Sequence, residues 1–434
     1  MHMKNKWLVG LVFLSSFGVK AQVLDLEKCL KMADTANVII RNARVDVAMS
    51  ASQIDAYQSA LLPKLIYAGD YKYNAIIPGQ LIPGQIAGGA PGTYVAVQFG
   101  VPVNISNTVQ LNQVLFNPQL NAAIKTLKIN QEVSEIQAGL TEQNVKYQLI
   151  QTYYNLQAVH KQLKFVQENL VNMDKMIVNM KAMYEQKLVI STELDKLNIT
   201  RLTLKNQEQT LISTKEKTEN YLKLMIGITI NDKVEFQLEG AVQRSLLQEQ
   251  KGINALDIQL LQAQQRLNVV ERKGINMAYL PVLSFYGTYL YSYNYRPENS
   301  FGKGINGAFV GLKLDWTLFD GFEKHHKSKV NLFQRGKIAD QLDYSKKQLD
   351  VNIINAQKQV EIQTQSLQIS QEQLVLSEKV QKQAKFSFEQ GVISSNDLLK
   401  SENDLYQAQT NVVVAYVQLR QAELELLKLT GNIK

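Results

Sequence analysis

The sequence has few of the residues that interrupt regular structure or cross-link a chain. Of its 434 residues, 8 are proline, 23 are glycine and one, Cys29, is cysteine. A single cysteine excludes an intrachain disulfide. The scarcity of proline and glycine favours a few very long elements over several compact domains. Cys29 lies at helical spacing in the segment LEKCLKMA, where we expect a buried, small apolar side chain.

Long hydrophobic runs are absent beyond the N-terminus. In the first 21 residues, Lys4 and Lys6 precede an apolar run, and Val19 and Ala21 occupy the small-residue positions of a cleavage site. This pattern predicts a secretory signal peptide over 1–21, and no cysteine follows it directly to carry a lipid anchor. Later segments are too short or too polar for a membrane helix, so an exported chain that enters a membrane would do so as strands.

Motifs for catalysis and metal binding are also missing. We find no paired-histidine zinc motif, nucleophile elbow or phosphate-binding loop. His325 and His326 are adjacent, so in a helix they point about 100° apart and do not readily share a metal. The net charge of +8 comes from lysines scattered among glutamine and glutamate, which is typical of solvated helix faces. The sequence therefore predicts no enzyme activity, no cofactor, no metal and no nucleic-acid partner.

Two halves of the sequence repeat one another. ALLPKLIYAGDYKY in the first half matches AYLPVLSFYGTYLY in the second, and YEQKLVISTELDK matches FEQGVISSNDLLK. The matching pairs of segments are 60–73 with 278–291, 109–116 with 312–319, and 184–196 with 388–400. Three matches in the same order make chance similarity improbable, so the chain is two copies of one unit.

We therefore predict a first repeat over 22–227, an equatorial connection over 228–253, a second repeat over 254–431 and a tail over 432–434. In each repeat an opening helix ends at a Leu-Pro pair, at Pro63 or Pro281, because proline stops helix propagation. Two strands, a very long helix, a tight turn and a final helix follow. The predicted opening helices are 28–60 and 254–278; the strands are 64–74, 104–116, 282–294 and 307–319; the long helices are 118–185 and 321–388; the turns are 185–191 and 389–395; the final helices are 192–226 and 395–431.

Heptad spacing indicates that the long helices pack as coiled coils. Apolar residues recur every seven positions in the last helix, at Leu398, Leu405, Val412, Leu419 and Leu426. The helix 321–388 carries a second apolar stripe at Ile362, Ile369 and Leu376, which indicates a neighbour on each side. A bundle or closed wall of helices fits this pattern, and a simple long helical hairpin is the alternative.

The strands have one aromatic and one charged face. In 64–74, Leu65, Tyr67, Tyr71 and Tyr73 alternate with Lys64, Ile66, Asp70 and Lys72. This alternation is typical of a strand between lipid and an aqueous lumen, and a small sheet packed on helices is the alternative. Four strands cannot close a barrel, so closure requires several copies of the chain; the twelve strands of a trimer would leave an open channel.

The doubled unit, the passages LKLDWTLFDGFEK and FEQGVISSNDLLKSENDLYQAQ, and the terminal LLKLTG resemble the TolC-like outer-membrane efflux family over the mature length. The resemblance implies a mainly α chain with a membrane β-barrel part, assembled as a homotrimer whose barrel in the outer membrane of a Gram-negative cell continues as a helical tunnel in the periplasm. It implies a periplasmic adaptor (membrane fusion protein), an inner-membrane transporter and outer-membrane lipid as partners.

The function implied is a passive exit duct for small molecules. The exit duct of type I protein secretion, and a periplasmic coiled-coil scaffold that never inserts in a membrane, are alternatives.

The resemblance also assigns roles to the two turns. It implies an adaptor-docking tip formed by Lys187, Leu188, Ser191, Gly391, Val392 and Ser395, with Lys187 in place of the usual glycine. It further implies that acidic residues just past the turns narrow the tunnel, at Glu193 and Asp397. Lys196 and Lys400 follow one turn later and make the ring mixed in charge, hence less selective for cations. The two acidic residues also suit helix N-termini, so both roles can hold together.

Overall fold

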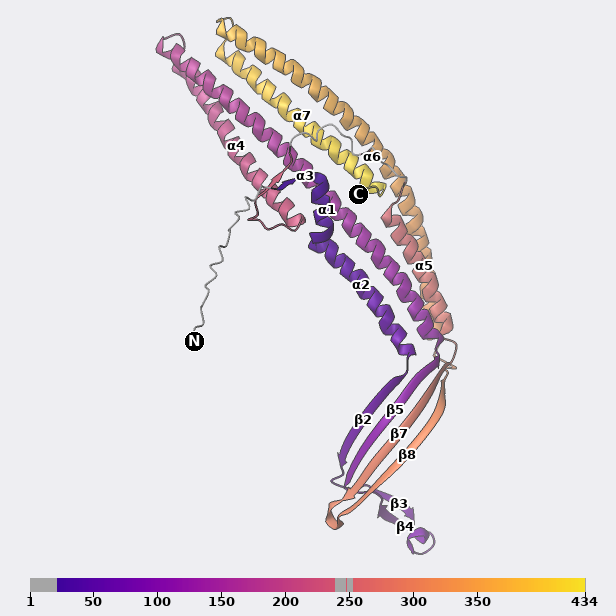
Figure 1. Ribbon diagram of the computed structural model, residues 1–434. Coiled ribbons are helices and arrows are strands. Elements are labelled where there is room, and N and C mark those ends of the chain that lie inside the picture. Colours follow the sequence, from indigo (N-terminus) through magenta and orange to yellow (C-terminus); the bar gives the residue numbers. More distant parts are fainter. Residues whose placement is uncertain (1–21, 239–246, 248–252, 434) are drawn as a thin grey trace, which may run out of the picture. The chain divides into compact units, whose positions relative to one another are not determined.

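The computed structural model describes residues 22–238, 247 and 253–433 (Figure 1). The predicted signal peptide lies outside the described residues, as do most of the connection between 239 and 252 and the final residue. The chain divides into two compact units. The helical unit contains the described parts of 1–42, 140–255 and 348–434, and the sheet unit contains 43–139 and 256–347. Among the described helices, none is long and apolar enough to cross a membrane.

The sheet unit is built around four antiparallel strands, two from each repeat. They are β2 (Lys64–Tyr73), β5 (Val103–Phe116), β7 (Val282–Arg296) and β8 (Phe301–Asp315). Their order in the sheet is β2-β5-β7-β8, so the two repeats meet where β5 pairs with β7 (Figure 1). In this sheet β2 and β8 are each paired on one side only.

The register separates the side chains of the sheet into two faces. On one face the cross-strand neighbours are Leu65 with Leu111, Tyr67 with Val109, Tyr71 with Ile105, Val109 with Tyr289, and Ile105 with Tyr293. On the other face they are Lys64 with Asn112, Asp70 with Ser106, and Ser106 with Ser292. Asn104 Nδ2 on this polar face donates to Ser292 Oγ at 2.9 Å and to Asn294 Oδ1 at 2.8 Å. The predicted division into an aromatic and a polar face extends across β2, β5 and β7.

The fourth strand differs from its predicted range, since it covers Phe301–Asp315 rather than 307–319. The glycines of FGKG predicted a loop. In the sheet, glycines of β8 leave room for tyrosine rings of β7. A Cβ at Gly304, within FGKG, would lie 2.7 Å from Tyr291 Oη, and a Cβ at Gly311, further along β8, would lie 2.8 Å from Tyr286 Oη. Aromatic rings that cover cross-strand glycines stabilise strands. This packing gives a physical reason for the many tyrosines of β7.

The loop between β2 and β5 contains a hairpin that the sequence did not predict. It consists of β3 (Gly79–Pro83), a short 3-10 turn at Gly84–Ala87, and β4 (Tyr94–Gln98). The repeated glycine and proline residues of this segment predicted a loop, so its two strands of five residues each were not recognised. Between β7 and β8, by contrast, the connection is a single short turn at Pro297–Asn299.

Each repeat has its own set of helices. The first repeat contains α1 (Leu26–Ala36), α2 (Val38–Gln58), α3 (Pro118–Glu185) and α4 (Ser191–Met225). The second contains α5 (Leu256–Met277), α6 (Glu323–Glu389) and α7 (Ser395–Leu429). A 3-10 turn at Ser59–Leu61 ends the first opening segment, and Pro63 and Pro281 each stand directly before a strand.

The first opening helix is broken, whereas the sequence predicted one helix over 28–60. Asn37 lies between α1 and α2 with an extended backbone. Its Oδ1 accepts hydrogen bonds from the backbone N–H groups of Ile39 and Ile40, at 2.9 and 3.3 Å, and so caps α2. Its Nδ2 donates to the carbonyl oxygen of Met225 at 2.8 Å, which ties the break to the end of α4. Asparagine favours such caps because its side chain replaces missing helical partners.

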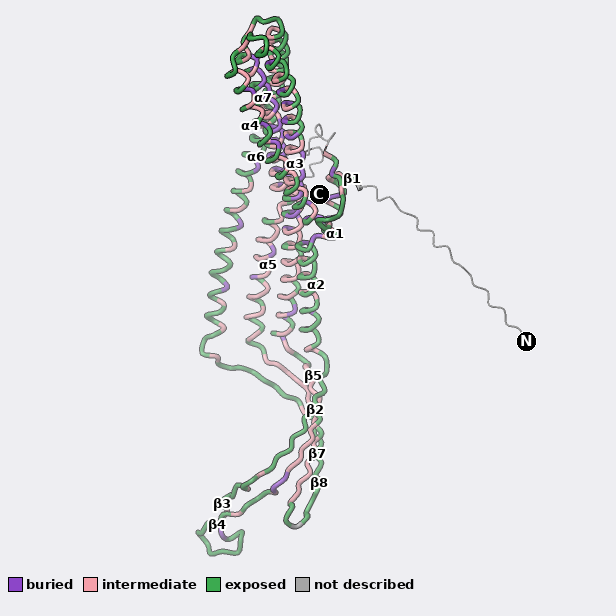
Figure 2. The backbone as a smooth tube through the Cα atoms, turned by 90° about the vertical axis from the view of Figure 1, so that its left-hand side faces the viewer, coloured by how far each residue is buried: buried purple, intermediate pink, exposed green. Residues whose placement is uncertain are grey.

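Apolar packing in the helical unit includes two regions of buried side chains. The first is a core around α1, α3 and α4, closed by the short parallel pair β1 (Gln22–Leu24) and β6 (Val234–Phe236). Cys29 lies in this core, and burial raises the pKa of its thiol to about 12. The second is the heptad seam of α7, where Leu398, Leu405, Leu419 and Leu426 are buried as predicted. Buried positions recur along α7 in Figure 2. Val412 in the same series is partly buried.

Replacing Gly304 by valine tests the tyrosine packing. The Cβ would force the Tyr291 ring away from β8, and we expect the free energy of unfolding to fall by roughly 1 kcal/mol, the upper range for a cross-strand pair. Gly307→Val is the matched control, because a Cβ there meets no atom within 4 Å and valine favours strands. Thermal unfolding of the detergent-solubilised protein would measure both. Equal stability of the two variants would contradict the packing role.

Candidate functional site

The turns that join α3 to α4 and α6 to α7 have the same backbone geometry. At the first, Lys187 N donates to Tyr184 O and Leu188 N to Met183 O, both at 2.9 Å. At the second, Gly391 N donates to Phe388 O and Val392 N to Ser387 O, again at 2.9 Å. This pair of bonds is the Schellman motif, which ends a helix through one left-handed residue. The two repeats therefore end their long helices identically.

The left-handed residue is where the turns differ in sequence. Gly391 has φ of 72° and Lys187 has φ of 60°. Glycine adopts this conformation freely, whereas a residue with a Cβ pays about 1 kcal/mol or more for it. Gly227 and Gly431, at the far ends of α4 and α7, occupy the equivalent position of two further Schellman motifs, with φ of 71° and 69°. Lys187 is thus the one strained residue among these four positions.

Apolar side chains at both turns point into solvent. Leu188 is 65% exposed, Ile190 66% and Val392 75%. Ser191 is also exposed, and Ser395 is half-buried. Contiguous exposed apolar side chains rimmed by polar ones are typical of protein–protein contact surfaces. Of the six residues predicted for the docking tip, five are exposed and Ser395 is not.

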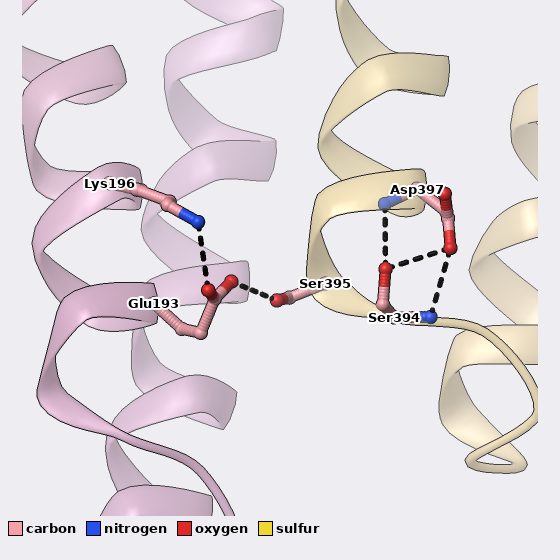
Figure 3. A network of polar contacts seen from close by, with 5 residues as sticks. All are labelled: Glu193, Lys196, Ser394, Ser395 and Asp397. Atoms are coloured by element: carbon pink, nitrogen blue, oxygen red, sulfur yellow. Dashed lines mark hydrogen bonds and ion pairs between the residues drawn. The ribbon is translucent and has the colours of Figure 1, made fainter.

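The second turn leads into α7 through a capping box. Ser394 Oγ accepts from Asp397 N at 3.2 Å, and the Asp397 carboxylate accepts from Ser394 N at 3.3 Å and from Ser394 Oγ at 2.7 Å (Figure 3). These bonds satisfy N–H groups that a helix start leaves unpaired. In the first repeat Ile190 holds the N-cap position and makes no side-chain cap.

Glu193, the other acidic residue, connects the two turns instead of capping its own helix. Its Oε2 accepts from Ser395 Oγ at 2.6 Å, and its Oε1 pairs with Lys196 Nζ at 2.9 Å (Figure 3). The bond from Ser395 lowers the pKa of Glu193 most, followed by the bond from Lys196. A carboxylate that stays ionised in mildly acidic solution can hold the start of α4 against the start of α7.

The four residues predicted for the tunnel constriction therefore do different things within one chain. Glu193 and Lys196 are brought together as an ion pair, with Ser395 as a third partner. Asp397 serves the cap of α7, and Lys400 lies exposed one turn further along. Sequence reasoning missed the bond between Glu193 and Ser395, because no periodic pattern relates two residues 202 positions apart.

Behind the turns, a methionine-rich core packs the helices together. Met173, Met180, Leu197 and Leu204 are buried between α3 and α4, and Phe388 and Leu399 of the other hairpin pack against them. Further from the turns, the hairpins also make a polar contact, because Asn169 Nδ2 of α3 donates to Gln409 Oε1 of α7 at 3.3 Å. The two hairpins thus meet through both apolar and directional polar contacts.

Within the described residues, no group of three histidine, cysteine or acidic side chains is arranged to hold a metal. The rings of His325 and His326 lie edge to face, with centroids 5.5 Å apart. Both side chains are exposed at the start of α6.

Comparison with known proteins gives a consistent result. A family model described as outer membrane efflux protein matches residues 271–432. The chain is similar to the CmeC outer membrane channel of Campylobacter jejuni, with 15% identity, a TM-score of 0.74, and coverage of 94% of this chain and 85% of that chain. It is also similar to the outer membrane protein VceC of Vibrio cholerae, with 12% identity, a TM-score of 0.72, and coverage of 94% and 96%.

A third similar structure is the open state of the MtrE outer membrane channel of Neisseria gonorrhoeae, with 14% identity, a TM-score of 0.71, and coverage of 94% and 89%. No curated protein sequence matches the chain. The family model confirms the resemblance predicted from the sequence for most of the second repeat. The solved structures confirm the predicted fold of long paired helices and four strands over nearly the whole chain.

The lowered pKa of Glu193 gives a pH test of the bond to Ser395. A depressed pKa in the folded state means that the stabilisation is present above the ordinary glutamate range and is lost as the pH falls through the lowered value. We expect Glu193→Gln to lower the thermal midpoint by a few degrees at pH 7, and this difference to shrink as the pH falls below the ordinary glutamate range. Glu216→Gln removes an exposed carboxylate from the same helix and should leave the midpoint unchanged. A difference that persists undiminished in acid would rule out the assigned contact.

Proposed function

We propose that three copies of this chain form a passive exit duct in the outer membrane of a Gram-negative cell. The strands would close as one barrel in the membrane, and the paired helices would continue it as a tunnel in the periplasm. An inner-membrane transporter would deliver small molecules to the duct through a periplasmic adaptor protein. The chain would reach this location through its signal peptide, without a lipid anchor and without a cofactor.

The observation that carries the proposal is the two-faced sheet with two open edges. One face is aromatic and aliphatic and the other is polar, as a wall between lipid and water requires. Open edges are not tolerated in lipid, so β2 and β8 need partners from other copies. Four strands per copy give twelve in a trimer, enough for a water-filled lumen, whereas the eight of a dimer would be filled by side chains.

The helical unit supports the same assembly. The second apolar stripe of α6 is exposed, with Ile362 at 45%, Ile369 at 65% and Leu376 at 64%. Residues seven apart lie on one helix face, so the stripe offers a continuous seam for a helix of a neighbouring copy. The heptad seam of α7, by contrast, is already covered inside the chain.

Membrane extraction and conductance test the duct. We expect the protein to leave outer membranes only with detergent, as a trimer, and to produce single-channel currents in planar bilayers. Lys400→Asp should then increase the permeability of cations over anions severalfold, if Lys400 lines the narrow part of the tunnel. The reversal potential in a salt gradient measures this ratio. A soluble monomer without conductance would favour the scaffold alternative, and an unchanged reversal potential would remove Lys400 from the constriction.

The proposed docking tip is tested at Val392, the most exposed apolar residue of the second turn. A charge placed there would have to be desolvated at an apolar contact, so Val392→Asp should reduce export about tenfold. Val392→Thr keeps the shape of the side chain without the charge and should export nearly normally. Accumulation of ethidium in intact cells measures export, and trimer formation and conductance should stay as in the wild type. Normal ethidium export by Val392→Asp would contradict docking at this turn.

A further inference from the structure

The segment that links β8 to α6 exposes four large apolar side chains within seven residues. Trp316 is 57% exposed, Leu318 80%, Phe319 73% and Phe322 63%. Phe319 and Phe322 stack edge to face, with ring centroids 5.5 Å apart. Trp316 is also held in place, because its Nε1 donates to the carbonyl oxygen of Tyr279 at 3.0 Å. The link therefore gathers several ordered, exposed apolar side chains within seven residues at the end of a strand.

The backbone of this link is strained beside the apolar side chains. Gly321 and Phe322 both have a left-handed backbone, with φ of 65° and 67°. For a bulky residue this conformation is a genuine outlier, and such strain persists where the surroundings or a function require it. Asp320 holds the turn, since its Oδ2 accepts from Lys324 N at 3.1 Å and pairs with Lys324 Nζ at 3.1 Å.

Positive charge follows the aromatic cluster directly. Lys324, His325, His326, Lys327 and Lys329 lie in the first two turns of α6, with Glu323 as the one acidic residue among them. Lys324 is largely buried, between Asp320 and the ring of Tyr279, and so supports the turn. Lys327 and Lys329 are exposed, although Lys327 also pairs with Glu323 across one helical turn. Two lysines thus extend from the surface beside the apolar side chains.

The first repeat provides an internal comparison. Its equivalent link from β5 to α3 has Gln113 where the second repeat has Trp316, and proline follows Asn117 where Gly321 and Phe322 follow Asp320. Asn117 caps α3 by accepting from Leu120 N at 3.0 Å, and no residue of that link has a positive φ. The same connection is therefore made without tryptophan and without a left-handed residue, although Leu115 and Phe116 are exposed there as well and one exposed lysine, Lys125, lies in the region equivalent to 324–329. Trp316, the left-handed Phe322 and the denser run of basic side chains in 324–329 are thus particular to the second link.

We propose that the segment 316–329, which we call the aromatic–basic link, docks on the periplasmic leaflet of the outer membrane and prefers anionic phospholipid there. The inference rests on the proposed function, because that function places the apolar face of β8 in lipid. Leu312 and Leu314 of that face are exposed and run directly into Trp316, so the apolar surface is continuous from strand to link. Aromatic rings favour the headgroup boundary of a bilayer, and adjacent lysines reach the phosphates.

Trp316 makes this proposal directly measurable. The sequence contains two tryptophans, and the other, Trp7, lies in the predicted signal peptide. The fluorescence of the mature protein therefore reports on the aromatic–basic link alone. The full mature protein would be reconstituted in phosphatidylcholine vesicles that contain either brominated phosphatidylcholine or, at the same mole fraction, brominated phosphatidylglycerol.

We expect both brominated lipids to quench Trp316, and the phosphatidylglycerol form to quench about twofold more strongly. The double variant Lys327→Gln with Lys329→Gln should bring this ratio to one while phosphatidylcholine quenching persists. Lys346→Gln with Lys347→Gln, which removes two exposed lysines further along α6, is the matched control and should keep the wild-type ratio.

Conductance of the same vesicles reports on the duct separately. Conducting vesicles in which neither brominated lipid quenches Trp316 would show that another copy of the chain covers the link, and would overturn the proposal while leaving the duct intact. Equal quenching by the two lipids in the wild type would overturn the preference for anionic headgroups. Quenching in vesicles that do not conduct would support the link and count against the duct.

Discussion

The open edges of the sheet are the constraint on which the rest of the molecule depends. β2 and β8 each leave a row of backbone donors and acceptors without a partner in the sheet of one chain. The face of aromatic and aliphatic side chains makes water an unsuitable neighbour, and lipid offers no hydrogen bonds at all. Main-chain pairing between copies would give these donors and acceptors partners and let the apolar face lie in lipid. In the proposed duct, the number of strands that each chain supplies therefore determines how many copies assemble, independently of contacts between helices.

The helical unit is held together by a different balance of forces. Around α1, α3 and α4 a dry apolar core includes Leu149, Leu156 and Leu222, all fully buried. Nearer the turns, α3 and α7 also meet through amide and carboxylate contacts, and α4 meets α7 through Glu193 and Ser395. Polar contacts are directional and can separate without exposing much apolar area. The ends of the hairpins therefore combine such polar contacts with the methionine-rich core behind the turns.

Periodic features were predictable from the sequence, and single contacts were not. The heptads of α7, the alternation in β2 and the duplicated turns all repeat, so their residues identify an element and its buried face. Asn37 interrupts a helical pattern at one position, and its role depends on a carbonyl group of α4. Gly302 and Gly304 of β8 predicted a loop because the tyrosines that cover them belong to another strand. Glu193 was assigned to a constriction, and its partner Ser395 could be found only in three dimensions.

In the proposed trimer, the duplication of the chain would give the position of Lys187 a further meaning. Each chain carries two turns with the same hydrogen-bond pattern, so the proposed trimer would present six such turns around its end. Three of them bear a strained lysine and three a glycine. A ring of six identical partner domains would meet two alternating chemistries and would have to tolerate both. Three partner domains could instead bind only one of the two kinds of turn, and the charge of Lys187 would determine whether they bind the first or the second.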